Sequence, residues 1–234
     1  MRRSVLLVAL LALFLPQPGG AESGSSLYLQ HCVSCHGRGG AGVPPGGKNF
    51  GPPLQGAGAQ AADFYLTTGY MPVEEADQEP VRKSSPFSED EIRSLVDYIG
   101  SFGGPPVPQP DPERGSAGEG LRLFTENCAG CHQVAAQGGL IVGGTAPALA
   151  DSTPIQIAEA VRVGPYLMPR FTTKQLDERQ VDSIIRYVQV AQHPDDRGGW
   201  GLGHLGPIPE GLVAWLLAGG ALVGVAVLIG ARAP

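Results

Sequence analysis

The four cysteines of this 234-residue chain all fall in two short motifs that end in histidine. One motif is CVSCH at residues 32–36, and the other is CAGCH at residues 128–132. This spacing is typical of covalent haem attachment, because one turn of chain presents two thiols to the two vinyl groups of the porphyrin and then an imidazole to the iron. A zinc site would gather four ligands per ion, and a redox dithiol has no use for the same histidine in both motifs. The sequence therefore predicts two covalently bound haem c groups, with these cysteine and axial histidine ligands: Cys32, Cys35, Cys128, Cys131, His36 and His132.

The sixth ligand of each iron follows by elimination. Besides the initiator, the chain has two methionines, Met71 and Met168, which lie 35 and 36 residues after the motif histidines and precede proline. A methionine is more often a core filler, but one per motif at matched spacing favours iron ligation. Histidine–methionine ligation raises the haem potential and occupies both axial positions, so no catalysis is expected from this chain alone. The remaining histidines are weaker candidates for the same position: His31, His193 and His204.

The two motifs belong to an internal duplication with an offset of 96 residues. GSSLYLQHCVSCH, which begins at Gly24, aligns with GLRLFTENCAGCH, which begins at Gly120. Each copy has fewer than 90 residues and hence little core of its own. A large apolar group such as haem is expected to fill each copy.

Each copy closes with an apolar stripe at helical spacing, over residues 92–99 and 181–188. A capping box, in which a hydroxyl residue and a glutamate or glutamine three positions later cap each other, is typical of a helix start. Ser88 with Glu91, and Thr172 with Gln175, have this spacing. We therefore expect both closing helices to begin at these boxes.

The two ends of the chain carry targeting and membrane signals. Met1-Arg2-Arg3 precedes an apolar run over residues 5–15 and a small-residue site near Ala21, which predicts a secretory signal peptide or, alternatively, an uncleaved anchor. Residues 212–231 carry no charge and reach about 30 Å as a helix, the thickness of a hydrocarbon core. Arg232 follows this stretch, as the positive-inside rule favours. The sequence predicts a single-pass protein of the cell membrane, with extracytoplasmic haem domains and a cytoplasmic C-terminus.

The predicted fold class is all-α, in two tandem haem domains and one transmembrane helix. Five prolines between residues 105 and 112 indicate a semi-extended linker outside any core. A net charge of −6 without a basic cluster argues against nucleic-acid binding. The expected organisation is a signal peptide (1–21), a first domain (22–104), a linker (105–114), a second domain (115–197), a pre-membrane segment (198–211) and a transmembrane helix (212–231).

Each copy resembles a class I cytochrome c domain. In that family a glycine and an aromatic residue of the first helix pack across the last helix, and Gly24 with Tyr28 matches this pattern in copy one, as Gly120 with Phe124 does in copy two. The family also has a proline whose carbonyl accepts a hydrogen bond from the axial histidine. The resemblance places this role on Pro52 and Pro147.

The whole chain is similar to the dihaem cytochrome c subunit of actinobacterial menaquinol–cytochrome c reductases, the cytochrome bcc complexes. The order of parts carries this resemblance, together with FGPPL at residues 50–54 and GGWGLGHLGPIPEG at residues 198–211. It implies a respiratory electron-transfer subunit beside a cytochrome b subunit. In this arrangement the Rieske iron–sulfur protein reduces the first haem, and the second haem passes the electron to a terminal cytochrome c oxidase.

Two other readings share the same motifs: a free-standing anchored electron shuttle, and a dihaem subunit of another oxidase or dehydrogenase. A dihaem peroxidase or a gas sensor would need an open coordination position on one iron, and the matched methionines argue against it.

Overall fold

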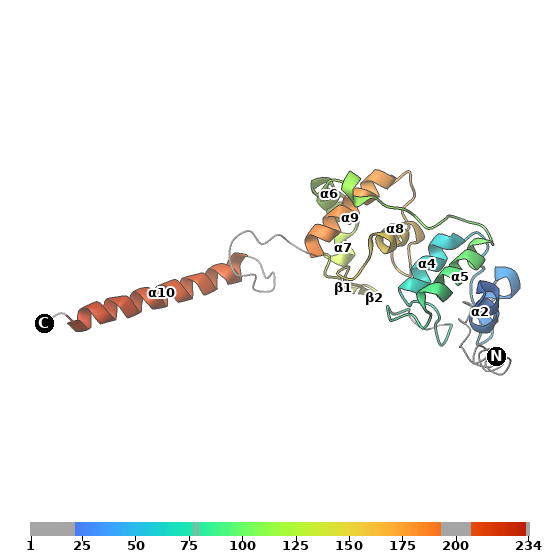
Figure 1. Cartoon of the computed structure of the whole chain (residues 1–234), viewed down its shortest axis with the longest axis horizontal. Coiled ribbons are helices and arrows are strands. Elements are labelled where there is room, and N and C mark those ends of the chain that lie inside the picture. Colours follow the sequence, from blue (N-terminus) through green and yellow to red (C-terminus); the bar gives the residue numbers. More distant parts are fainter. Residues whose placement is uncertain (1–21, 77, 79, 193–206, 233–234) are drawn as a thin grey trace, which may run out of the picture.

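The computed structural model describes residues 22–76, 78, 80–192 and 207–232, and it is mostly helical (Figure 1). The predicted signal peptide, His193, His204 and most of the predicted pre-membrane segment lie outside the described residues.

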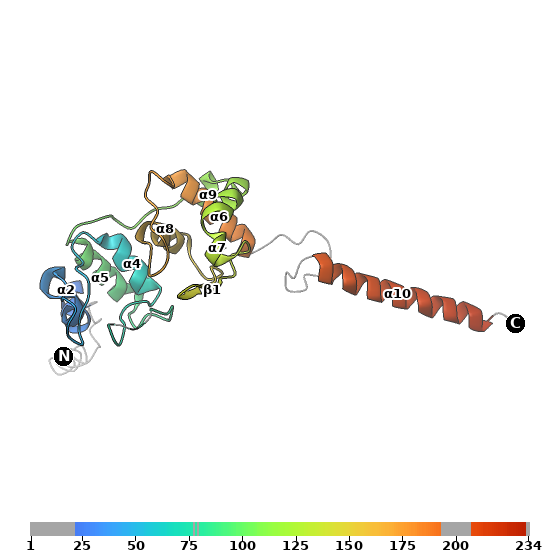
Figure 2. The same cartoon turned by 180° about the vertical axis from the view of Figure 1, so that it is seen from behind.

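The body of the molecule repeats one arrangement of four helices. The first half contains α2 (Gly24–His31), α3 (Val33–His36), α4 (Gly58–Thr67) and α5 (Glu89–Gly100), with a short 3₁₀ helix, η1 (Arg38–Gly40). The second half contains α6 (Ala117–Asn127), α7 (Ala129–His132), α8 (Pro154–Val163) and α9 (Glu178–Gln192), preceded by η2 (Pro112–Arg114). α2 packs on α5 as α6 packs on α9, and α4 packs on α5 as α8 packs on α9. α4 also packs against α8, and Figures 1 and 2 both place these two helices side by side between the halves.

In each half the first helix crosses the closing helix at a glycine. A Cβ at Gly24 would lie 1.9 Å from the carbonyl oxygen of Ser94, and a Cβ at Gly120 would lie 1.9 Å from that of Ser183. No side chain fits at either point, so only glycine permits this close approach. The aromatic residue four positions on packs its ring beside a tyrosine of the closing helix, as predicted, in the pairs Tyr28–Tyr98 and Phe124–Tyr187.

Each half has a separate hydrophobic cluster. The first cluster is centred on the α2–α5 crossing and the second on the α6–α9 crossing. The predicted apolar stripes supply the buried face of each closing helix: Ile92, Leu95, Val96 and Ile99 in α5, and Val181, Ile184, Ile185 and Val188 in α9.

The predicted helix start is confirmed in the first half and wrong in the second. Ser88 and Glu91 form the expected capping box, and α5 begins at the next residue. Thr172 and Gln175 also bond to each other, but they close only a single turn. A second pair, Asp177 and Gln180, caps the start of α9, because each backbone N–H of the pair donates to the side chain of the other residue. The intervening Leu176 is 3 % exposed and belongs to the second cluster. If α9 extended back through Leu176 at 3.6 residues per turn, this side chain would lie away from the buried face of the helix. The interruption of the helix before α9 therefore allows Leu176 to enter the core.

The expectation of an all-α fold misses one small hairpin. β1 (Gly139–Ile141) pairs antiparallel with β2 (Gly144–Ala146), with a two-residue connection at Val142 and Gly143. Gly143 has φ +86°, a conformation that tight hairpin turns favour and that costs glycine little.

The proline-rich linker is more closely attached to the body than predicted. Val107 packs against the first cluster, and the N–H of Asp111 donates to Asp182 Oδ1 of the second half at 2.8 Å. The backbone N–H of Gln60 donates to the carbonyl oxygen of Pro105 at 3.2 Å. The linker therefore contacts both halves along its course.

α10 (Pro207–Arg232) is the C-terminal helix. Its stretch Gly211–Arg232 has 22 residues, and by length and composition it can cross a membrane. None of that apolar stretch is buried against the protein. The helix matches the predicted transmembrane segment, with an earlier start.

Candidate functional site

Each CxxCH motif lies across a break between two helices. α2 ends at His31, Cys32 has φ −120° and ψ −31°, and α3 then carries Cys35 and His36. The N–H of His36 donates to the carbonyl oxygen of Cys32 at 2.9 Å, which closes one turn around the motif. Cys128 and His132 repeat this bond at 2.9 Å. The local backbone thus brings both thiols and the imidazole of each motif to one cavity.

The thiols do not have the properties of a redox dithiol. All four cysteines are free. Burial, with a smaller contribution from the second cysteine of each motif, raises the pKa of Cys32 and that of Cys128 to about 11. Reactive dithiols depend on a lowered pKa. The raised pKa of Cys32 and of Cys128, beside an apolar cavity, therefore favours thiols that bond to a porphyrin over a reactive dithiol.

Both motif histidines are held by a proline carbonyl, as the family resemblance predicted. His36 Nδ1 lies 2.8 Å from the carbonyl oxygen of Pro52, and His132 Nδ1 lies 3.0 Å from that of Pro147. A carbonyl only accepts, so Nδ1 carries the hydrogen and Nε2 keeps its lone pair for a metal. Burial lowers the pKa of His132, against an opposing effect of the Pro147 bond, which favours the neutral ring that a ligand requires.

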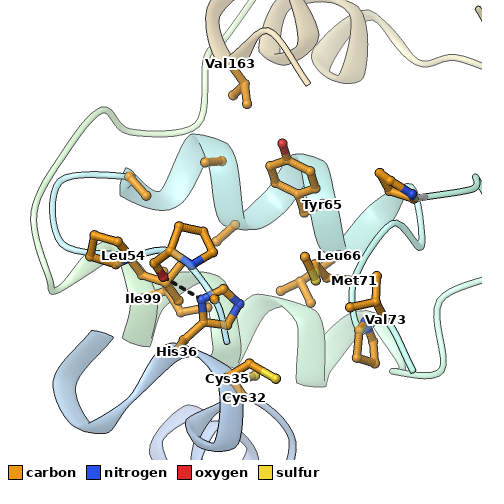
Figure 3. Close-up of a pocket in the computed structure, with 18 of the residues that line it drawn as sticks. Cys32, Cys35, His36, Leu54, Tyr65, Leu66, Met71, Val73, Ile99 and Val163 are labelled. Carbon is orange, nitrogen blue, oxygen red and sulfur yellow. Dashed lines mark hydrogen bonds between the residues drawn. The ribbon is translucent and has the colours of Figure 1, made fainter. Parts of the chain in front are cut away.

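The first cavity has a volume of about 700 Å³ and is lined mostly by apolar side chains. His36 enters it from α3, and the Met71 sulfur faces it from the loop after α4 (Figure 3). The volume lies within the range of about 300–1,000 Å³ typical of cofactor pockets. Two thiols, an imidazole with a free Nε2 and a thioether form the donor set of a c-type haem, so the residues present fit this group.

The second cavity contains the same donor set in a narrower space. Cys128, Cys131, His132 and Met168 line it, and its volume is about 180 Å³. These four side chains fit the same group as those of the first cavity.

His31, a weaker ligand candidate, lines the rim of the first cavity. Its exposed ring packs edge-on against Phe87, with the ring centroids 5.2 Å apart. This contact gives it a packing role.

The residues that line both cavities were not predicted from the sequence as parts of a site. Tyr65, Pro80 and Tyr166 line both cavities. Tyr166 has φ +53°, a conformation uncommon for a residue with a side chain and often found near functional sites. No motif spacing points to these positions, because they become neighbours only when α4 packs against α8.

Polar contacts also join the halves at this interface. Arg82 donates to Ser152 Oγ at 3.1 Å, to the carbonyl oxygen of Asp151 at 3.0 Å and to Gln156 Oε1 at 2.9 Å. Gln156 Nε2 in turn donates to Thr67 Oγ1 at 3.2 Å. These bonds tie the start of α8 to α4 and to the segment that follows Met71.

Comparison with known proteins finds relatives along most of the chain. The family model for cytochrome c oxidase, cbb3-type, subunit III matches residues 19–99 and 115–188, which correspond to the two copies. The cytochrome bc1 complex cytochrome c subunit of Mycobacterium tuberculosis is 37 % identical over 221 residues, covering 90 % of this chain and 78 % of that protein. The same subunit of Corynebacterium diphtheriae is 33 % identical over 230 residues, covering 90 % and 80 %.

A more distant relative is the CcoP subunit of a cbb3-type cytochrome c oxidase from Azospirillum sp.. It is 27 % identical over 186 residues, covering 70 % of this chain and 60 % of that protein. Among solved structures, a chain of the Kuenenia stuttgartiensis reducing HAO-like protein complex aligns with a TM-score of 0.36 at 16 % identity, covering 76 % of this chain and 99 % of that chain.

Proposed function

This chain belongs to the family of cytochrome c subunits of actinobacterial cytochrome bc1 complexes, and from this membership we propose that it is the membrane-anchored dihaem electron-transfer subunit of such a complex. It carries electrons from the Rieske iron–sulfur protein, beside cytochrome b, to a terminal cytochrome c oxidase. The observation that carries this proposal is the pair of CxxCH cavities, each built by the same four-helix arrangement. Haem c, when bound, supplies one-electron chemistry at iron.

The residues of each site have separate tasks. Cys32 and Cys35 would hold the first haem by thioether bonds, and His36, through Nε2, and Met71 would ligate its iron. Pro52 holds the imidazole in the required tautomer through its 2.8 Å bond. The second site uses the equivalent set: Cys128, Cys131, His132, Met168 and Pro147.

The packing of these ligands suits electron transfer rather than substrate chemistry. His132 is 8 % exposed, and Met71 and Met168 pack against the hydrophobic cluster of their own half. Histidine and methionine ligands at each iron would leave no position open to water or to a small substrate. The chain therefore contributes to a quinol–cytochrome c reductase as its electron carrier.

The anchor keeps the two haem domains close to partners at the membrane surface. The stretch Gly211–Arg232 is apolar, and Arg232 at its end favours a cytoplasmic C-terminus. The organisation is a signal peptide (1–21), two class I cytochrome c domains (22–104 and 115–197) joined by the linker (105–114), a pre-membrane segment (198–211) and one transmembrane helix (212–231). The two separate family-model matches support the two-domain count.

A second candidate is a dihaem subunit of a cbb3-type oxidase, which the name of the matching family model and the CcoP relative favour. The two candidates differ in the proteins that accompany the chain. Identity to the cytochrome bc1 complex subunits is higher and extends over more of the chain, which favours the first candidate.

The deciding experiment is purification of the tagged chain from its native membrane in mild detergent. We expect b-type haem and a Rieske iron–sulfur protein to accompany it. A matched control replaces residues 207–232 with an unrelated membrane span, which separates capture by the haem domains from capture by the anchor. Isolation of the haem-bearing chain alone would indicate a free-standing shuttle, and association with a copper oxidase without an iron–sulfur protein would indicate the oxidase subunit.

A further inference from the structure

One end of the first cavity is closed by the second half of the chain. Most of its lining residues come from residues 31–105, but Arg162, Val163, Tyr166 and Arg170 also line it. Figure 3 shows Val163 and the hydroxyl of Tyr65 at the end opposite Cys32 and Cys35. The second half therefore meets the first cavity at the end far from the cysteines.

A tight reversal after α8 brings the two arginines to this end. α8 ends at Val163 and is capped by Gly164, which has φ +63°, and a Cβ at Gly164 would lie 2.7 Å from the backbone nitrogen of Arg170. The N–H of Phe171 donates to the carbonyl oxygen of Val161 at 2.9 Å, which closes the loop. Arg162 and Arg170 are thus held close to each other by backbone geometry.

Arg162 is held by two backbone carbonyl groups, and its other N–H groups have no partner among the described residues. Its Nη1 donates to the carbonyl oxygens of Leu176 at 2.7 Å and Phe171 at 3.3 Å. A guanidinium has five N–H donors in a fixed fork, so these bonds leave others for a ligand. Burial lowers the pKa of Arg162, and the charges of Glu178 and Asp177 oppose this effect.

The described lining of the first cavity has an unbalanced charge. Among the described residues that line it, Arg162 and Arg170 are the arginines, and none carries a carboxylate. Arginine side chains in a largely apolar pocket match a ligand with planar carboxylates, which they bind by charge-assisted bonds. A haem joined to the cysteines through its vinyl groups would carry its two carboxylates on the opposite side of the porphyrin, and the end of the cavity far from the cysteines is the end that the second half closes.

We propose that Arg162 and Arg170 bind the carboxylate groups of the haem held at Cys32 and Cys35, so that the second half of the chain completes the first haem site. The inference rests on the proposed function only in requiring haem at that motif. The two halves then form one electron-transfer unit, because the loop that carries Met168 of the second site also carries Arg170 of the first.

The test is a redox titration of the purified intact chain, as the wild type and as two separate variants, Arg170→Gln and Arg162→Lys. Mass spectrometry first counts the haems bound to each. Removal of a cation beside a haem stabilises its oxidised form. Arg170→Gln should therefore lower the equilibrium constant for reduction of the first haem about tenfold, which lowers its reduction potential by about 59 mV for a one-electron couple. Arg162→Lys keeps the charge but loses the paired N–H donors of the guanidinium. It should change the resonance Raman bands of the haem propionates, which are its carboxylate groups, and should shift the reduction potential less than Arg170→Gln does. Met71→His identifies the first haem, because replacement of methionine by a nitrogen ligand lowers its potential.

Arg122→Gln is the matched control, since it removes an equal charge from an exposed residue of the second half that pairs with Glu126. We expect this variant to leave both potentials unchanged. The inference is overturned if Arg170→Gln shifts the reduction potential of the second haem only, or if its shift is no larger than that of Arg122→Gln. Either result leaves the proposed function unaffected. A chain without haem at Cys32 and Cys35 overturns both.

Discussion

The carboxyl group of Glu159 in α8 is fully buried beside the carboxyl group of Asp63 in α4, at the contact between the two halves. No N–H or hydroxyl donor among the described residues reaches either Glu159 oxygen. Two neighbouring carboxyl groups can share a hydrogen bond only when one of them carries a proton. Burial, and next the charge of Asp63, raises the pKa of Glu159 to about 9, while burial also raises the pKa of Asp63. At neutral pH this proton resides mainly on Glu159.

We expect this pair to make the stability of the protein fall with rising pH. The ordinary pKa of a glutamate is 4.5, and that of Glu159 in the folded chain is about 9. A raised pKa gives stability that is fully present below the unfolded value and lost as pH rises toward the folded value. Between pH 5 and pH 9 the melting temperature should fall by at least about 4 °C, the effect of about 1 kcal/mol in a small domain.

Glu159→Gln should flatten this dependence, because the amide stays neutral and can donate to Asp63. The measurement is thermal unfolding followed by circular dichroism across the pH series. Glu75→Gln, which changes an exposed glutamate of the first half, is the control and should leave the slope unchanged. Parallel curves for the wild type and Glu159→Gln would show that the pair is not protonated in the folded state.

Alanine at either crossing glycine should destabilise the protein strongly. A Cβ at Gly24 or Gly120 would lie 1.9 Å from a backbone carbonyl oxygen, which cannot move without separating two helices. We expect a loss of about 3 kcal/mol or more in the free energy of unfolding, at the upper end of overpacking effects. Denaturant titration of each variant measures this loss.

Gly118→Ala in α6 is the matched control for this prediction. The nearest atom to a Cβ there is Ser116 Oγ at 3.9 Å, so alanine fits. Alanine is the better helix former by about 1 kcal/mol, and this variant should be slightly more stable than the wild type. Equal effects at positions 118 and 120 would mean that the crossing is looser than described.

Met71→Ala and Met168→Ala should each remove one axial sulfur. For each variant we expect loss of part of the near-infrared sulfur-to-iron band and a lower potential at one haem only. Leu140→Ala, at a residue that is 91 % exposed, is the control. A methionine whose replacement leaves both the band and the potentials unchanged is a packing residue.

Mass spectrometry of the chain should show two covalent haem additions. Replacement of Cys128 and Cys131 by alanine should leave one addition, because the first motif lies in its own cavity with its own histidine and proline carbonyl. The pyridine haemochrome spectrum checks the same count through the α band of the thioether-linked haem. A wild-type chain with one addition would restrict haem to a single motif.

Local patterns in the sequence were sufficient for the features that depend on neighbouring residues. The CxxCH motifs, the helical stripes and the Ser88–Glu91 capping box are each contained within a few turns of chain, and the structure forms the helices accordingly. The resemblance of both copies to class I cytochrome c domains then predicted the proline and glycine roles, and His36, Pro52, Gly24 and their counterparts have the expected contacts. The prediction failed where local bonds competed with burial, as at Leu176, whose entry into the core delays the start of α9.

Only the tertiary structure decided how the two copies meet. The packing of α4 against α8 places Tyr65 and Tyr166 on a wall common to both cavities, brings Arg162 and Arg170 to the first cavity, and buries Glu159 beside Asp63. These residues come from separate copies and share no spacing rule. Their proximity depends on which helix faces remain uncovered once each copy has folded, and a periodicity within one helix carries no information about the face it will meet on another.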